Sequence, residues 1–209
     1  MSVRPLSFAS LLLSVIVATS AAAAPVEGRD YTRLSTPQRS DTPGKVEVIE
    51  FFSYGCPHCA DVNPQLKPWE GKLPADAVFK RVPVGFGRPA WQSLARAYYA
   101  LEATGDLERL DQPLFDAIHK QRLPLQDERS IAAWVGKQGG NAAAFSAAFK
   151  SFAVVNKTAR AEELTRRYQI MQVPTFAVDG RYIVLGDSHE AVLGNASALV
   201  TQTQRNASR

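Results

Sequence analysis

The chain has 209 residues, of which 45% are hydrophobic and 21% are charged, and its formal net charge is +4. This balance predicts a soluble globular protein with one domain, or one domain with an insertion, and excludes collagen-like and low-complexity chains. The basic residues are scattered along the chain rather than clustered, so the charge does not indicate binding to nucleic acid.

The first 23 residues predict a signal peptide. Arg4 supplies a basic start, residues 6–18 are mostly apolar, and residues 21–24 are alanines, which a signal peptidase accepts. The apolar run is shorter than the ~20 residues that span a membrane, and an uncleaved N-terminal anchor is the alternative. Cleavage after Ala23 would place the protein in an oxidising compartment, where disulfides persist.

The first regular elements are predicted between residues 46 and 84. Residues 46–52 (VEVIEFF) are apolar, β-branched and aromatic, and they are too few for a typical helix, which predicts a buried strand. A helix is predicted from Pro57 towards Lys72, because proline suits its first position, and Pro64 is expected to kink it. Residues 78–84 predict a second strand.

A long helical stretch is predicted over residues 90–168. Apolar side chains recur there at helical spacing, with little sign of strands. Pro113 is expected at a helix start or a kink, and Gly139-Gly140 is expected to separate two shorter helices.

Strands are predicted again near the end of the chain. Residues 175–178 and 181–185 flank Asp179-Gly180, the strongest short signal for a hairpin. A last helix is expected over residues 188–203, before a frayed polar tail. The order of elements predicts an α/β core that a helical insertion interrupts.

The two cysteines of the chain form the motif Cys56-Pro57-His58-Cys59. Zinc usually takes four ligands and there is no second cysteine pair, while haem attachment needs a histidine where Ala60 stands. A structural disulfide across four residues would restrict the unfolded chain by only ~2 kcal/mol, which is little for a chain that can build its own core. A redox-active pair is the fourth interpretation and the one that we favour.

The local sequence suits redox chemistry. Cys56 is expected at the start of a helix, where free N–H groups and the positive end of the helix dipole favour a thiolate. His58 can add a further donor or a positive charge. We therefore predict that Cys56 is an exposed nucleophile with a lowered pKa, and that Cys59 is the buried resolving thiol. A stabilised thiolate makes the disulfide a stronger oxidant.

The chain resembles the DsbA family of thiol:disulfide interchange proteins, whose hallmark is Pro-His between the two cysteines. The matching residues are 50–59 (EFFSYGCPHC) and, far downstream, 173–176 (VPTF) and 179–182 (DGRY). The helical insertion between the two halves also agrees, and the resemblance covers essentially the whole mature chain. It implies a thioredoxin fold with an inserted helical subdomain.

On this resemblance the chain divides into six parts. They are a signal peptide at 1–23, an N-terminal extension at 24–45, the first part of the thioredoxin core at 46–88, the helical insertion at 89–169, the second part of the core at 170–204 and a tail at 205–209.

The resemblance also implies roles for residues outside the cysteine motif. Pro174 would be a cis-proline packed against the disulfide, and Val173 would offer its backbone to an extended substrate; an ordinary trans turn is the alternative. Glu50 would be a buried acid that assists proton transfer with Cys59, unless it is a partly exposed residue at a strand end. Lys80 is a candidate partner for Glu50, although the sequence does not fix the strand register.

The sequence and the resemblance together predict seven functional residues. The catalytic residues are Cys56, Cys59, His58, Pro57 and Glu50, and the substrate-binding residues are Val173 and Pro174. Gly55 and Thr175 are the positions at which this chain departs from some members of the family, which bears on redox potential and substrate preference.

The resemblance implies a monomeric, periplasmic protein disulfide oxidoreductase. Its disulfide would pass to newly exported proteins with free cysteines through a mixed disulfide, and a quinone-linked, DsbB-type protein of the inner membrane would reoxidise it. No bound cofactor, metal or nucleic acid is expected. The alternatives are an isomerase or reductase, which usually carries an extra dimerisation domain, and a non-catalytic periplasmic chaperone that binds unfolded peptides through the same groove.

Overall fold

The computed structural model describes residues 24–207, so the predicted signal peptide lies outside the described residues. Its centre is a five-stranded sheet with the strand order β1-β5-β4-β2-β3. The strands are β1 (Tyr31–Arg33), β2 (Val46–Phe52), β3 (Ala77–Pro83), β4 (Thr175–Val178) and β5 (Tyr182–Val184). Strands β2 and β3 are parallel, and the other pairs are antiparallel.

Helices make up most of the remaining chain. They are α1 (Pro57–Glu70), α2 (Pro89–Thr104), α3 (Leu107–His119), α4 (Glu128–Lys137), α5 (Ala142–Lys150), α6 (Phe152–Arg167) and α7 (His189–Ala207). Within the described part of the chain, none of these helices is long and apolar enough to cross a membrane.

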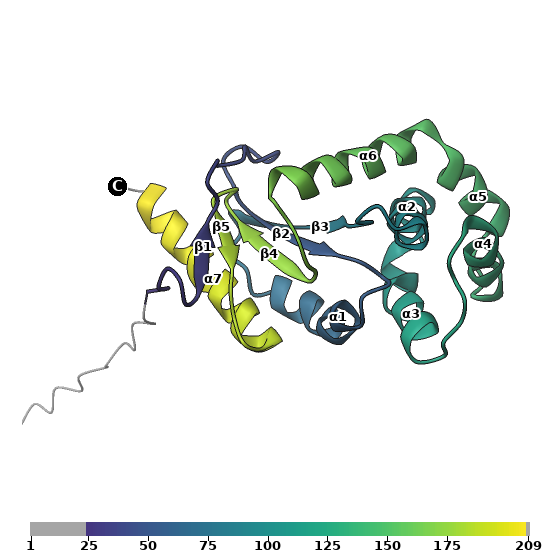
Figure 1. Ribbon diagram of the computed structural model, residues 1–209, viewed down its shortest axis with the longest axis horizontal. Coiled ribbons are helices and arrows are strands. Elements are labelled where there is room, and N and C mark those ends of the chain that lie inside the picture. The colour runs from purple at the N-terminus through teal and green to yellow at the C-terminus, as the bar shows by residue number, and fades with distance from the viewer. Residues whose placement is uncertain (1–23, 208–209) are drawn as a thin grey trace, which may run out of the picture.

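Helices cover both faces of the sheet (Figure 1). Helices α1 and α7 pack on one face, where Val48 of β2 belongs to the same buried cluster as Leu66 and Leu193. Helix α6 packs on the other face, where Phe51 and Tyr168 share a cluster. Successive side chains of a strand point to opposite faces of the sheet. Because helices cover both faces of β2, all seven of its residues are buried.

The insertion between β3 and β4 forms a second core beside the sheet (Figure 1). Helices α2 to α5 supply most of it, and Phe52 and Tyr54 enter it from the end of β2, together with both cysteines. Capping residues fix the starts of two of these helices. Asp127 forms a capping box with Ser130 at the start of α4, and the Asn141 side chain accepts a hydrogen bond from the backbone N–H of Ala144 at the start of α5.

The structure confirms most of the predicted elements and corrects two. Strand β1 was not predicted, because its three residues are too few to show a pattern and are held by pairing with β5. Of the two positions expected for Pro113, a helix start or a kink, the structure excludes the helix start, because Pro113 lies inside α3, which the buried side chains of Leu110 and Leu114 anchor. Helix α7 continues to Ala207, because no glycine or proline follows Gly194 to end it, so residues 205–207 of the predicted tail are helical.

Candidate active site

The two cysteines lie where β2 has ended and α1 begins. Cys56 is the N-cap residue of α1, with an extended backbone, and Pro57 is the first helical residue. The unsatisfied backbone N–H groups of the first turn therefore lie close to the Cys56 sulfur. Both thiols are free and belong to the core that the insertion shares with the end of β2.

The two thiols have opposite electrostatic environments. A hydrogen bond from the Cys59 thiol, aided by the backbone N–H groups of Cys59 and His58 and by the charge of His58, lowers the pKa of Cys56 to about 6, although burial opposes this. Burial, followed by the hydrogen bond and charge of Cys56 and the charge of Glu50, raises the pKa of Cys59. Cys56 is therefore the thiol that ionises first.

The predicted lowering of the Cys56 pKa is confirmed, but its causes and the exposure of Cys56 differ from the prediction. The Cys59 thiol is the strongest cause and His58 is the weakest of those named. The His58 side chain is 74% exposed and its Nδ1 lies 3.9 Å from the Asp61 carboxylate. Cys56 is only 5% exposed, because it lies within the shared core, so it is not the open nucleophile that was predicted.

The segment before β4 lies directly against Cys56. The Val173–Pro174 peptide bond is cis, as predicted. The Cys56 thiol donates to the carbonyl oxygen of Val173 at 3.2 Å. Thr175 pairs with Phe51 in β2, and this antiparallel pairing brings the proline segment beside the start of α1.

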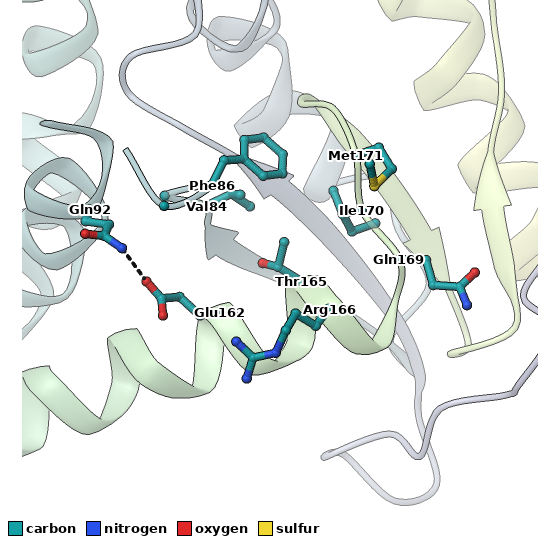
Figure 2. A pocket seen from close by; sticks show the side chains of 11 residues that line it. Val84, Phe86, Gln92, Glu162, Thr165, Arg166, Gln169, Ile170 and Met171 are labelled. Atoms are coloured by element: carbon teal, nitrogen blue, oxygen red, sulfur yellow. Dashed lines mark hydrogen bonds between the residues drawn. The ribbon is translucent and has the colours of Figure 1, made fainter. Parts of the chain in front are cut away.

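One open cavity is lined by this proline segment, and another is lined by the residues just before it. The first, of about 520 Å³, is lined by residues that include His58, Val62, Gln172, Val173, Pro174 and His189. The second, of about 550 Å³, is shown in Figure 2, and its apolar lining comes from Val84, Phe86, Ile170 and Met171. Gln92 and Glu162, hydrogen-bonded at 3.3 Å, lie at one side of it (Figure 2). Concave surface is thus available beside Val173.

Glu50 is fully buried, but its partner is Arg81 and not Lys80. The Nε of Arg81 donates to Oε2 of Glu50 at 2.5 Å. Glu50 lies opposite Arg81 in the parallel register of β2 and β3, so both side chains point to the same face. Lys80 points to the other face, where it pairs with Glu47. Burial raises the pKa of Glu50, and Arg81 opposes this effect.

Three further residues at the site were not found from the sequence. His119 of α3 donates from Nε2 to the Tyr54 carbonyl at 2.7 Å. Asp111 of α3 accepts from Arg81 at 2.9 Å. A Cβ atom at Gly55 would lie 2.5 Å from Nε1 of Trp91, so the indole of Trp91 fills the space beside Gly55. A side chain on a helix carries no sign of its distant partner in the sequence, so only the fold identifies these three.

The described residues hold no group of three or more histidine, cysteine, aspartate and glutamate side chains arranged to bind a metal ion.

A sheet with helices on both faces and a Cys-x-x-Cys pair beside a cis-proline define a dithiol protein of the thioredoxin class. A family model for the DSBA-like thioredoxin domain matches residues 71–198. The thiol:disulfide interchange protein DsbA of Bordetella parapertussis is 35% identical over 209 residues, covering 95% of this chain and 98% of that protein. The DsbA of Pseudomonas syringae pv. tomato is 38% identical over 178 residues, covering 85% and 83%.

Solved structures agree with this similarity. The crystal structure of Pseudomonas aeruginosa DsbA has a TM-score of 0.83 and 34% identity, covering 87% of this chain and 96% of that one. The DsbA structure from Xylella fastidiosa has a TM-score of 0.82 and 32% identity, covering 88% and 100%. The chain therefore belongs to the DsbA-like thioredoxin family and is a protein thiol–disulfide oxidoreductase, and the predicted fold is confirmed.

Proposed function

We propose that this oxidoreductase donates a Cys56–Cys59 disulfide to newly exported proteins that carry free cysteines. The observation that carries the proposal is the contrast between the two thiols, since the pKa of Cys56 is lowered to about 6 while that of Cys59 is raised. A stabilised Cys56 thiolate favours the reduced form of the pair. The disulfide is therefore readily given up to a substrate.

The reaction proceeds in two exchanges. A substrate thiolate attacks the Cys56 sulfur, a substrate–Cys56 disulfide forms, and the Cys56–Cys59 bond breaks with its electron pair leaving on Cys59. Cys59 then takes up a proton, in keeping with its raised pKa. A second substrate thiolate attacks the substrate sulfur and releases Cys56 as a thiolate. The substrate has lost two electrons, and the enzyme is left as a dithiol.

We assign substrate positioning to Val173 and Pro174. An extended substrate segment would lie along the backbone at Val173 in the manner of an added strand. The contact between the Cys56 sulfur and the Val173 carbonyl supports this assignment, because it places the reacting sulfur beside that backbone. The cavity of about 520 Å³ that Val173 and Pro174 help to line offers room for a neighbouring substrate side chain.

The protein would act as a monomer in the periplasm after cleavage of the signal peptide. A DsbB-type protein of the inner membrane would reoxidise the dithiol and pass its two electrons to a quinone. The membership of the DsbA-like family and the N-terminal sequence pattern support this part of the proposal.

The test is oxidation of a reduced, unfolded model protein with two cysteines by a stoichiometric amount of the oxidised enzyme. We expect one substrate disulfide to form per enzyme, and the Cys56→Ser variant to form none. Alkylation of the reduced enzyme should abolish turnover with an added oxidant. Equal protection of the substrate from aggregation by alkylated and untreated enzyme, without oxidation by either, would favour the chaperone alternative. Unscrambling of a wrongly paired substrate as the dominant activity would favour an isomerase.

A further inference from the structure

A buried ionic cluster is built around Glu50, and the charge of Glu50 raises the pKa of Cys59. The Arg81 guanidinium contacts two carboxylates, with Nε 2.5 Å from Oε2 of Glu50 and Nη1 2.9 Å from Oδ2 of Asp111. The side chains of Glu50, Arg81 and Asp111 are 0%, 12% and 18% exposed. Arg81 also lies over the Phe52 ring, with 4.0 Å between its Cζ and the ring centroid. The cluster combines two acids with one cation, so it would carry a net negative charge if all three groups were ionised.

Asp111, on helix α3 of the insertion, connects this cluster to other elements by hydrogen bonds. Its Oδ1 accepts from the Tyr54 hydroxyl at 2.6 Å, and its Oδ2 accepts from Nδ2 of Asn63 at 2.9 Å as well as from Arg81. All of these contacts are donated to Asp111, which suits a carboxylate. One side chain of α3 is thereby bonded to the loop before Cys56, to α1 and to β3.

Glu50 has one oxygen that is free for a proton. Its Oε2 is bonded to Arg81, while its Oε1 is buried and finds no hydrogen-bond partner among the described residues. A buried, unpaired carboxylate oxygen is costly, and a proton on it removes that cost. Burial raises the pKa of Glu50, and the charge of Asp111 adds to this effect while Arg81 opposes it.

From this arrangement we infer that Asp111 is a positioning residue: by sharing Arg81 with Glu50, it keeps Glu50 able to hold the proton that Cys59 takes up. The inference rests on the proposed function. When the Cys56–Cys59 bond breaks, Cys59 leaves as a thiolate, the Glu50 carboxyl gives it a proton, and Glu50 is left as a carboxylate facing Arg81. Water then returns a proton to Glu50.

The surroundings of Glu50 support this division of roles. The charged and titratable groups that act on Glu50 or are influenced by it come from several elements: Cys56 at the N-cap of α1, Cys59 of α1, Arg81 of β3, Tyr98 of α2 and Asp111 of α3. An open cavity of about 430 Å³ lined by Asn63, Arg81, Asp111 and Gln112 gives solvent access to the cluster.

The test is the Asp111→Asn variant of the full, oxidised enzyme. Asparagine keeps the shape of the side chain but removes its charge, so Arg81 is left to pair with Glu50 alone and the pKa of Glu50 should fall. We expect the carboxylic C=O stretch of Glu50, measured by infrared difference spectroscopy, to titrate at lower pH. We also expect the rate of disulfide reduction by a thiol peptide, at fixed thiolate concentration, to fall about tenfold at neutral pH, because a smaller fraction of Glu50 then holds the proton that Cys59 takes up.

Three further variants make the result specific. Asp116→Asn is the matched control, because Asp116 lies in the same helix and bonds Gln112 and Lys120 instead of Arg81. Asp111→Glu should restore much of the rate, because it restores the charge. In a Glu50→Gln background, Asp111→Asn should have no further effect on the pH profile.

Two results would overturn the inference. One is an unchanged Glu50 band and pH profile in Asp111→Asn. The other is an Asp111→Asn effect of undiminished size in the Glu50→Gln background, which would show a purely structural role. Both presuppose that the wild-type enzyme oxidises the peptide; if the wild type does not react, the proposed function itself fails.

Discussion

Cys56 and Cys59 have the same side chain and lie three positions apart, yet their surroundings favour opposite protonation states. Cys56 stands at the N-terminus of α1 and accepts a hydrogen bond from the Cys59 thiol. Cys59 is fully buried, and the charge of Glu50 acts on it. The lowered pKa of one thiol and the raised pKa of the other therefore arise partly from the same contact. Replacing Cys59 should disturb Cys56 more than replacing the exposed His58.

The first prediction is that Cys59→Ala raises the pKa of Cys56 more than His58→Ser does. The hydrogen bond from the Cys59 thiol is the strongest cause of the lowered pKa of Cys56, and the charge of His58 is the weakest of those named. His58→Ser should still raise it and make the enzyme less oxidising. Thiolate absorbance against pH measures both variants. A larger shift for His58→Ser would show that the histidine dominates.

The second prediction concerns Gly55. Its added Cβ would lie 2.5 Å from Trp91, so Gly55→Ala must displace the indole and should cost about 1–3 kcal/mol of unfolding free energy. Gly71→Ala is the matched control, because its Cβ would lie an ordinary 3.6 Å from the Lys67 carbonyl. Urea unfolding followed by tryptophan fluorescence compares the two. Equal midpoints for Gly55→Ala and the wild type would mean that Trp91 moves aside freely.

At the scale of elements, the two faces of β2 and β3 decide which charges meet. The even-numbered residues Val48, Glu50 and Phe52 point towards one side of the sheet and the odd-numbered ones towards the other. The parallel register then places Arg81 beside Glu50 and Lys80 on the opposite face. A one-residue change of register would exchange these partners.

The third prediction follows from this pairing. Arg81→Ala leaves the Glu50 carboxyl buried without its partner, and it should lower the free energy of unfolding by about 3 kcal/mol. Arg166→Ala, which removes an arginine from an exposed pair with Glu163, should cost less than about 1 kcal/mol. Denaturant midpoints of the two variants are the measurement. A small loss for Arg81→Ala would contradict this expectation, because it would show that the buried Glu50–Arg81 pair adds little to the stability of the fold.

Local patterns predict the elements well but not the contacts between them. The strand at 46–52, the helix start at Pro57 and the hairpin at Asp179-Gly180 each follow from a few adjacent residues, and the structure confirms them. The Glu50 partner was predicted wrongly, because register depends on pairing between strands that are distant in sequence. Asp111 belongs to an amphipathic helix whose polar face carries no mark of what it will meet.

On the scale of the whole molecule, the insertion and the sheet meet at the active-site loop. Helix α3 makes two hydrogen bonds to the active-site loop. His119 donates to the Tyr54 carbonyl, and Asp111 accepts from the Tyr54 hydroxyl. Phe52 and Tyr54 pack edge to face at 5.4 Å within the same core. We therefore expect the redox state of the cysteines to affect the stability of the fold.

The fourth prediction is a pH-dependent stability of the reduced enzyme. The pKa of Cys56 is lowered to about 6 in the folded state, against about 8.5 for an unfolded cysteine. The ionised thiolate thus stabilises the reduced fold fully above about pH 8.5, and this contribution is lost as the pH falls through about 6. The oxidised enzyme lacks this effect.

Denaturant unfolding of both forms between about pH 5 and pH 9 checks this expectation. The stability of the reduced form should decrease relative to that of the oxidised form as the pH is lowered, by at most about 3 kcal/mol over the range. A constant difference between the two forms across the range would mean that the thiolate makes no contribution to stability.

We expect the fold to hold Cys56 as a stabilised thiolate and so to make the Cys56–Cys59 disulfide an oxidant. Equilibration with glutathione buffers of known ratio, followed by counting of free thiols, measures this directly. We predict that the pair becomes reduced at glutathione ratios that leave an ordinary structural disulfide intact. A pair that stays oxidised throughout that range would show instead that the surroundings of Cys56 do not favour the reduced state.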